Sequence, residues 1–176
     1  MKRSSAILFT LLGLAGQSHI ASAGTINFNG TVTATTCDVK LDGDSGTVTL
    51  PTVSDSQLSV MSWTAGRTAF QLSLQNCQGA LKSAAAFFEA GPSVDSAGRL
   101  RNLSGTAKNV VLQLREGSGS YSPIVAGSPS QIANATYYTI PSTGIATLPY
   151  VVEYYAMGAA TAGTVVSNVV YTLQYK

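Results

Sequence analysis

Apolar and polar residues alternate in segments near both ends of the chain. Residues 24–34 place an apolar or small side chain at every second position, with Thr and Asn between them, and residues 163–176 follow the same pattern at most positions. A period of two is typical of a strand with one buried face. The apolar faces consist of Ile26, Phe28, Gly30, Val32 and Ala34 in the first segment and of Val165, Val169, Tyr171, Leu173 and Tyr175 in the second.

Clusters of turn-forming residues divide the rest of the chain into short segments rich in Thr, Val and Tyr, a composition typical of all-β proteins. About seven strands separated in this way predict an all-β, immunoglobulin-like sandwich. A short helical turn is expected within 54–61. The predicted strands are 31–39, 46–50, 69–76, 84–89, 110–115, 146–157 and 164–175.

The first 23 residues have the features of a secretory signal peptide. Lys2 and Arg3 precede an apolar run over 6–16, which is too short to span a bilayer as a helix. The small residues at 21–23 are typical of a cleavage site. We therefore predict that residues 1–23 are a signal peptide, and that 153 of the 176 residues remain as one domain-sized chain.

The charged residues of this predicted mature chain argue against nucleic-acid binding. Lys2 and Arg3 account for two of the ten basic residues, so eight basic and eight acidic residues remain, and the formal net charge is zero. His19 is the only histidine and lies in the leader, so the mature chain lacks the commonest general base and metal ligand. We expect no enzyme activity, no catalytic residue, no metal and no cofactor; a small secreted hydrolase is the alternative.

The chain has two cysteines, Cys37 and Cys77, which lie 40 positions apart. In an exported protein an isolated pair predicts a disulfide, with two free thiols as the alternative.

Residues 42–46 are faintly similar to a calcium-binding loop. Val53 stands where such a loop requires a bidentate Glu, so we interpret 42–46 as a turn.

Four features occur together in this sequence. Gly30 lies in an alternating strand just before the first cysteine, the two cysteines are 40 positions apart, Gly163 is fourteenth from the carboxyl end, and Tyr175 is penultimate. The combination resembles the structural pilins of chaperone–usher fimbriae of the type 1 kind. The phrases at 88–92 and 154–163 also look like this family. Each motif alone is weak, whereas the combination is specific.

The resemblance implies an incomplete immunoglobulin-like sandwich at 35–176 that lacks its last strand, preceded by a donor-strand extension at 24–34. Ile26, Phe28, Gly30 and Val32 would complete the sandwich of another subunit. The accepting groove, which a chaperone fills first, would be lined or bordered by Gly163, Val165, Val169, Tyr171, Leu173 and Tyr175.

The implied partners are identical or related pilin subunits in a homopolymer, a periplasmic chaperone and an outer-membrane usher. The implied location is the bacterial cell surface, reached through the periplasm, where a fimbria would support adhesion or biofilm formation. The resemblance names no host receptor.

Physical considerations favour the same hypothesis. Residues 164–174 contain neither the charges nor the prolines that normally protect an exposed strand edge. A donor and an acceptor on different surfaces make a head-to-tail contact, which builds filaments. For 24–34 the alternative is an ordinary first strand inside its own domain. For the function, a minor or adaptor fimbrial subunit or a carbohydrate-binding fimbrial module is the alternative to a major pilin.

Overall fold

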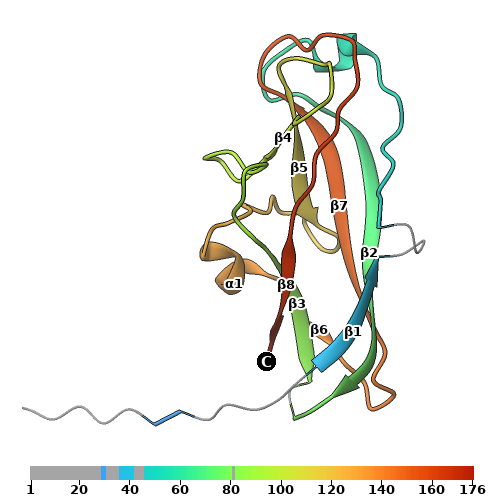
Figure 1. Cartoon of the computed structure of the whole chain (residues 1–176), viewed down its shortest axis with the longest axis vertical. Coiled ribbons are helices and arrows are strands. Elements are labelled where there is room, and N and C mark those ends of the chain that lie inside the picture. Colours follow the sequence, from blue (N-terminus) through green and yellow to red (C-terminus); the bar gives the residue numbers. More distant parts are fainter. Residues whose placement is uncertain (1–28, 31–35, 42–45, 81) are drawn as a thin grey trace, which may run out of the picture. The chain divides into compact units, whose positions relative to one another are not determined.

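Two antiparallel sheets pack face to face in the part of the chain that the computed structural model describes, residues 29–30, 36–41, 46–80 and 82–176 (Figure 1). Residues Thr33–Lys176 make up one compact unit of the chain. One sheet has the strand order β1-β2-β7-β5-β4 and the other has the order β6-β3-β8. The strands are β1 (Thr36–Leu41), β2 (Thr64–Gln78), β3 (Ser83–Phe88), β4 (Leu100–Arg101), β5 (Val110–Glu116), β6 (Tyr138–Thr139), β7 (Ala146–Ala156) and β8 (Tyr171–Tyr175).

The core lies between the two sheets and is built from alternate residues of the strands. Leu72 and Leu74 of β2 are buried and point toward this core. Phe88 of β3 meets Tyr150 of β7 edge to face, with ring centroids 5.1 Å apart. The Tyr150 hydroxyl accepts a hydrogen bond from the Ala86 N–H at 2.8 Å, so its polar atom is satisfied inside the core and joins the two sheets.

The outer face of the larger sheet holds a buried carboxylate. Glu153 of β7 is 1% exposed and accepts hydrogen bonds from Arg67 Nε of β2 at 2.9 Å and from Arg115 Nε of β5 at 2.5 Å. Gln113, which pairs with Glu153 in register, donates to the Ile124 carbonyl oxygen at 3.0 Å and is also buried. These charge-assisted and amide hydrogen bonds allow polar residues to be buried on this face.

Most predicted strands are confirmed, with altered bounds. The strand predicted at 69–76 is longer at both ends, the one at 146–157 ends one residue earlier, and residues 31–35 of the first predicted strand lie outside the described residues. The expected helical turn is a 3-10 helix, η1 (Asp55–Leu58), which begins with a capping box from Ser54 and Gln57.

Two predictions were wrong in extent. Residues 46–50 belong to no strand, and the final strand begins at Tyr171 rather than at 164. Both segments still alternate in burial: Val48 and Leu50, like Val165 and Val169, pack half-buried against the core. A strand also requires a hydrogen-bonded ladder with a neighbour, and within the described residues 46–50 and 164–170 form none.

The sequence patterns did not predict the short strands β4 and β6 or the helix α1 (Ser130–Asn134). The buried Gln131 side chain of α1 accepts a hydrogen bond from the Phe88 N–H and donates one to the Phe88 carbonyl oxygen, at 3.0 and 2.9 Å. The helix therefore provides hydrogen-bond partners for the backbone of Phe88 at the end of β3. No helix among the described residues is long and apolar enough to cross a membrane.

Candidate functional site

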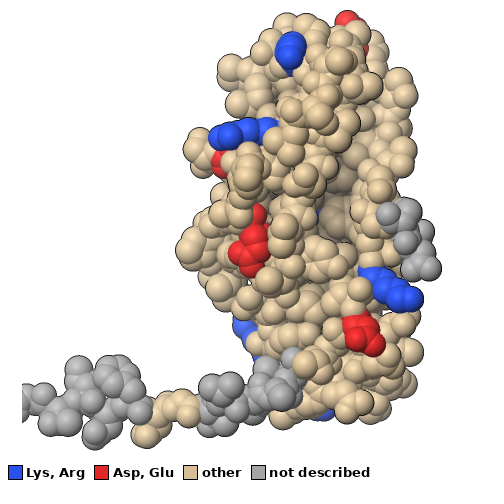
Figure 2. Space-filling view, viewed as in Figure 1, with Lys and Arg blue, Asp and Glu red and all other residues tan. Residues whose placement is uncertain are grey.

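An open apolar groove lies between the two segments that alternate without forming a strand. Val48 and Leu50 stand on one side of it and Val169 and Tyr171 on the other, around a cavity of about 550 Å³. Figure 2 shows the surface hollowed here, with charged side chains scattered singly around it. The other apolar lining residues are Leu41, Phe70, Leu72, Phe88, Leu100, Leu112, Leu114 and Val152.

A second cavity of about 630 Å³ continues along the same segment, beside residues 160–166. Leu58 of η1 and Val53 line one side of it, and Val165 lines the other. The two cavities together follow residues 163–171, which in extended conformation measure roughly 30 Å. We call this pair of cavities the groove; it is long enough for an extended segment of about nine residues.

The groove side formed by 164–170 makes its backbone hydrogen bonds along one edge. The carbonyl oxygens of Thr164, Val166 and Val170 accept bonds of 2.8–3.0 Å from the N–H groups of Ala107, Leu103 and Glu89. Among the described residues, the intervening Val165, Ser167 and Val169 make no backbone hydrogen bond. Alternate residues of a strand direct their backbone groups to opposite edges, so an unpaired strand edge faces the groove.

A buried hydroxyl group marks the same edge. Ser167 lines the groove, and its Oγ atom is buried without a hydrogen-bond partner among the described residues. An unsatisfied buried polar group costs about 1–3 kcal/mol. A strand laid along this edge would bring backbone donors and acceptors to Ser167.

The final strand β8 continues this edge. It pairs with β3 on one side and is the last strand of its sheet. Tyr171, Leu173 and Tyr175 pack half-buried against the core, as the alternation predicted. Burial raises the pKa of the Tyr171 and Tyr175 phenols.

Gly163 lies where the chain enters the groove and makes a close backbone approach. Its φ of +154° is rarely adopted by other residues, and a Cβ atom would stand 2.5 Å from the Ala107 nitrogen. A glycine is therefore required at this position for the 164–170 segment to reach the 102–107 loop.

The structure brings together the predicted groove residues Gly163, Val165, Val169, Tyr171, Leu173 and Tyr175 along one edge of the domain. Cys37 and Cys77 form a disulfide between β1 and β2, with Cα atoms 4.1 Å apart. Of the predicted donor residues, Ile26, Phe28 and Val32 lie outside the described residues. Gly30 is exposed.

Sequence reasoning missed the opposite side of the groove. Val48 and Leu50 were predicted as an ordinary strand, and Val53 and Leu58 were not singled out. The alternation of Val48 and Leu50 with Thr47 and Thr49 was the signal that could have identified this side. The sequence pattern does not distinguish a strand whose edge is unpaired from one that is paired with a neighbouring strand.

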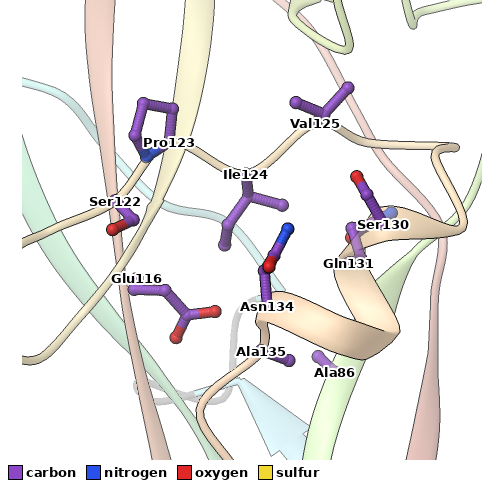
Figure 3. A pocket seen from close by; sticks show the side chains of 10 residues that line it. All are labelled: Ala86, Glu116, Ser122, Pro123, Ile124, Val125, Ser130, Gln131, Asn134 and Ala135. Carbon is purple, nitrogen blue, oxygen red and sulfur yellow. The ribbon is translucent and has the colours of Figure 1, made fainter.

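A small pocket of about 60 Å³, lined by both polar and apolar side chains, lies apart from the groove (Figure 3). The Glu116 carboxyl group points into it, and one of its oxygens, Oε2, has no hydrogen-bond partner among the described residues. Burial raises the pKa of Glu116, and hydrogen bonds from the Thr136 backbone and hydroxyl partly oppose this shift. No group of three or more His, Cys, Asp or Glu side chains suited to a metal occurs in the described part of the chain.

Comparison with known proteins agrees with this geometry. The model of a protein family described as FimA, type-1 fimbrial protein, A, matches residues 50–176, more than half of the chain. The chain belongs to the type-1 fimbrial protein family. Members of this family are structural pilins of chaperone–usher fimbriae rather than enzymes, and they are exported through the periplasm to the cell surface.

Individual relatives of this type-1 fimbrial protein support the assignment. It is 40% identical to the major fimbrial subunit SMF-1 of Stenotrophomonas maltophilia strain K279a, over 94% of this chain and 99% of the relative. It is 33% identical to the minor fimbrial subunit HifD of Haemophilus influenzae, over 86% of this chain and 74% of the relative. Its fold is similar to the P pilus rod subunit PapA, with a TM-score of 0.60 at 15% identity, covering 80% and 99% of the two chains.

Proposed function

We propose that this chain is the major structural subunit of a surface fimbria and polymerises by donor-strand exchange. Residues 24–34 of one subunit would enter the groove of the next, after a periplasmic chaperone has occupied it and an outer-membrane usher has released it. The fimbria would support adhesion or biofilm formation. This role needs no cofactor and no catalytic residue.

The observation that carries the proposal is the unpaired backbone edge of residues 164–170, which faces the groove. Residues 46–50 and 164–170 alternate in burial as strands do, but neither belongs to a strand ladder among the described residues. An inserted strand would lie between them. It would pair with the backbone of Val165, Ser167 and Val169 and cover the apolar side chains that line the groove.

The composition of residues 24–34 suits a strand that inserts into the groove. Ile26, Phe28 and Val32 stand on one face of an extended segment, and each would contribute about 1.5–3 kcal/mol on burial, before ordering costs. The 11 residues reach roughly 36 Å in extended conformation, which is enough to span the groove of roughly 30 Å. Gly30, with no side chain, suits a shallow point along it.

A peptide-binding experiment tests the proposal. The oxidised domain, Cys37–Lys176, is heated with and without a synthetic peptide of residues 24–34. We expect the peptide to raise the Tm by more than 10 °C, because it supplies the missing strand. The matched control peptide carries Ile26→Ser and Phe28→Ser and should raise the Tm far less. A domain that unfolds at the same temperature with either peptide would contradict donor-strand exchange.

The similarity to HifD keeps a second role open, that of a minor or adaptor subunit in a fimbria built mainly from another protein. Both roles use the same groove, so they differ in abundance rather than in chemistry. Quantitative mass spectrometry of purified fimbriae separates them. This chain should dominate the preparation if it is the major subunit and should be a trace component if it is an adaptor.

A further inference from the structure

One end of the domain carries an exposed apolar surface next to the groove. It consists of Val60, Met61, Trp63 and Met157, which we call the end patch; Met61 is 64% exposed and Trp63 is 50% exposed. Backbone hydrogen bonds hold these residues together: Ser62 N–H donates to the Ala156 carbonyl oxygen and Ala156 N–H to the Trp63 carbonyl oxygen, at 2.8 and 2.9 Å. The end patch is therefore a fixed feature of the fold, and exposed apolar clusters of this kind mark interaction sites.

The end patch adjoins the Gly163 end of the groove. Leu58, which lines the groove, lies two residues before Val60, and its carbonyl oxygen accepts a hydrogen bond of 3.0 Å from the Ala160 N–H. Anything that leaves the groove at this end passes close to the end patch.

The opposite end of the domain carries an exposed isoleucine. Ile145 is 58% exposed and directly precedes β7, whereas Met157 directly follows it. Ile145 lies close to the disulfide, because the Gly144 carbonyl oxygen accepts a hydrogen bond from the Cys77 N–H at 3.1 Å. The 11 residues of β7 therefore separate the end patch from Ile145 by roughly 35 Å.

The short connection between the donor strand and β1 determines which part of the next subunit approaches the end patch in a fibre. All ladders in the domain are antiparallel, and an antiparallel donor strand would place Val32 at the Gly163 end of the groove. Only residues 33–35 then separate Val32 from β1 of the incoming subunit, at most about 14 Å. Because Cys37 in β1 is bonded to Cys77, this short connection brings the disulfide end of that subunit, with Ile145, within reach of the end patch.

We propose that the end patch binds the Ile145 end of the next copy of this chain, so that each subunit junction has a second contact beside the inserted strand. The inference rests on the proposed donor-strand function. The contact joins two different surfaces and repeats along the fibre. It would limit the bending that a linker of three residues otherwise allows.

Cysteine cross-linking in fibres of the full mature chain tests the contact. Three double variants pair Ile145→Cys with Met61→Cys, Trp63→Cys or Met157→Cys, and a short bis-maleimide is added to the purified fibres. Cross-linking within one chain is excluded because β7 separates the two sites. We expect at least one pair to give a ladder of covalent dimers, trimers and higher multimers. The matched control, Ile132→Cys with Ile145→Cys, uses an exposed residue of α1 on the side of the domain and should give none.

The Gly30→Leu variant separates failure of this contact from failure of the proposed function. If Gly30→Leu blocks fibre formation and none of the three pairs gives a ladder, donor-strand exchange stands and the end contact is overturned. A product that stops at dimers also overturns it, because a head-to-tail contact must extend. If Gly30→Leu fibres form at normal yield, both proposals fall.

Discussion

Loss of the Glu153 side chain should strongly lower the free energy of unfolding of the domain. Its carboxylate is buried and bonded to Arg67 and Arg115. Removing the carboxylate breaks two hydrogen bonds to charged groups, each worth about 1.5–3 kcal/mol, and leaves Arg115, whose side chain is 20% exposed, without its anion. We expect Glu153→Ala to lower the free energy of unfolding by about 3 kcal/mol, measured by urea denaturation of the mature chain.

Arg67 provides the control for this prediction, because its side chain is 50% exposed. An exposed partner contributes about 1 kcal/mol or less, and after Arg67→Ala the carboxylate keeps Arg115. Equal losses in Glu153→Ala and Arg67→Ala would show that the carboxylate is not held by the pair of arginines.

Glu116 should make stability depend on pH. Burial raises its pKa in the folded state, so the folded protein holds this proton more tightly than the unfolded chain. The free energy of unfolding therefore falls as the pH rises from the usual Glu value of about 4.3 through the raised value. Glu116→Gln should remove this slope and unfold at higher urea than the wild type at pH 7 but not at pH 4.

The neighbouring groups of Glu116 are not expected to cause a pH dependence between pH 4 and 7. Tyr150 interacts electrostatically with Glu116, but burial raises the pKa of its phenol still further above this range, and Thr136 can still donate to the oxygen of a Gln. If the wild type and Glu116→Gln show parallel pH profiles between pH 4 and 7, the buried carboxyl group is not the source of the dependence.

Among the secondary-structure elements, period-two alternation correctly located the long strands, because each of them presents an apolar face to the core. It also identified the half-buried residues of 164–175. Alternation reports which side chains are buried and carries no information on which backbones pair. For this reason 46–50 was predicted as an ordinary strand, although it borders the groove.

Other elements had no signal in the sequence that could reveal them. β4 and β6 are two residues long, too short to show a period. Gln113 and Glu153 are polar residues that the alternation assigns to a solvated face, but hydrogen bonds and ion pairs from neighbouring strands bury them. The acceptor side of the groove was predictable, because the family resemblance named its residues. The opposite side, with Val53 and Leu58, depends on how η1 folds back.

In the molecule as a whole, apolar contacts rather than charge should drive assembly. The predicted mature chain has eight basic and eight acidic residues, and the apolar side chains of the groove and the end patch provide the proposed contacts. Salt screens the interactions between exposed charges. We expect the rate of fibre growth, followed by light scattering, to change less than about twofold between roughly 50 and 500 mM NaCl.

The variant Met61→Glu is the control for this prediction. It places a carboxylate in the end patch, opposite the end of the next subunit that holds Lys82 and Lys176. Its growth rate should fall with salt, whereas a tenfold fall in the wild type would mean that charged surfaces govern the assembly.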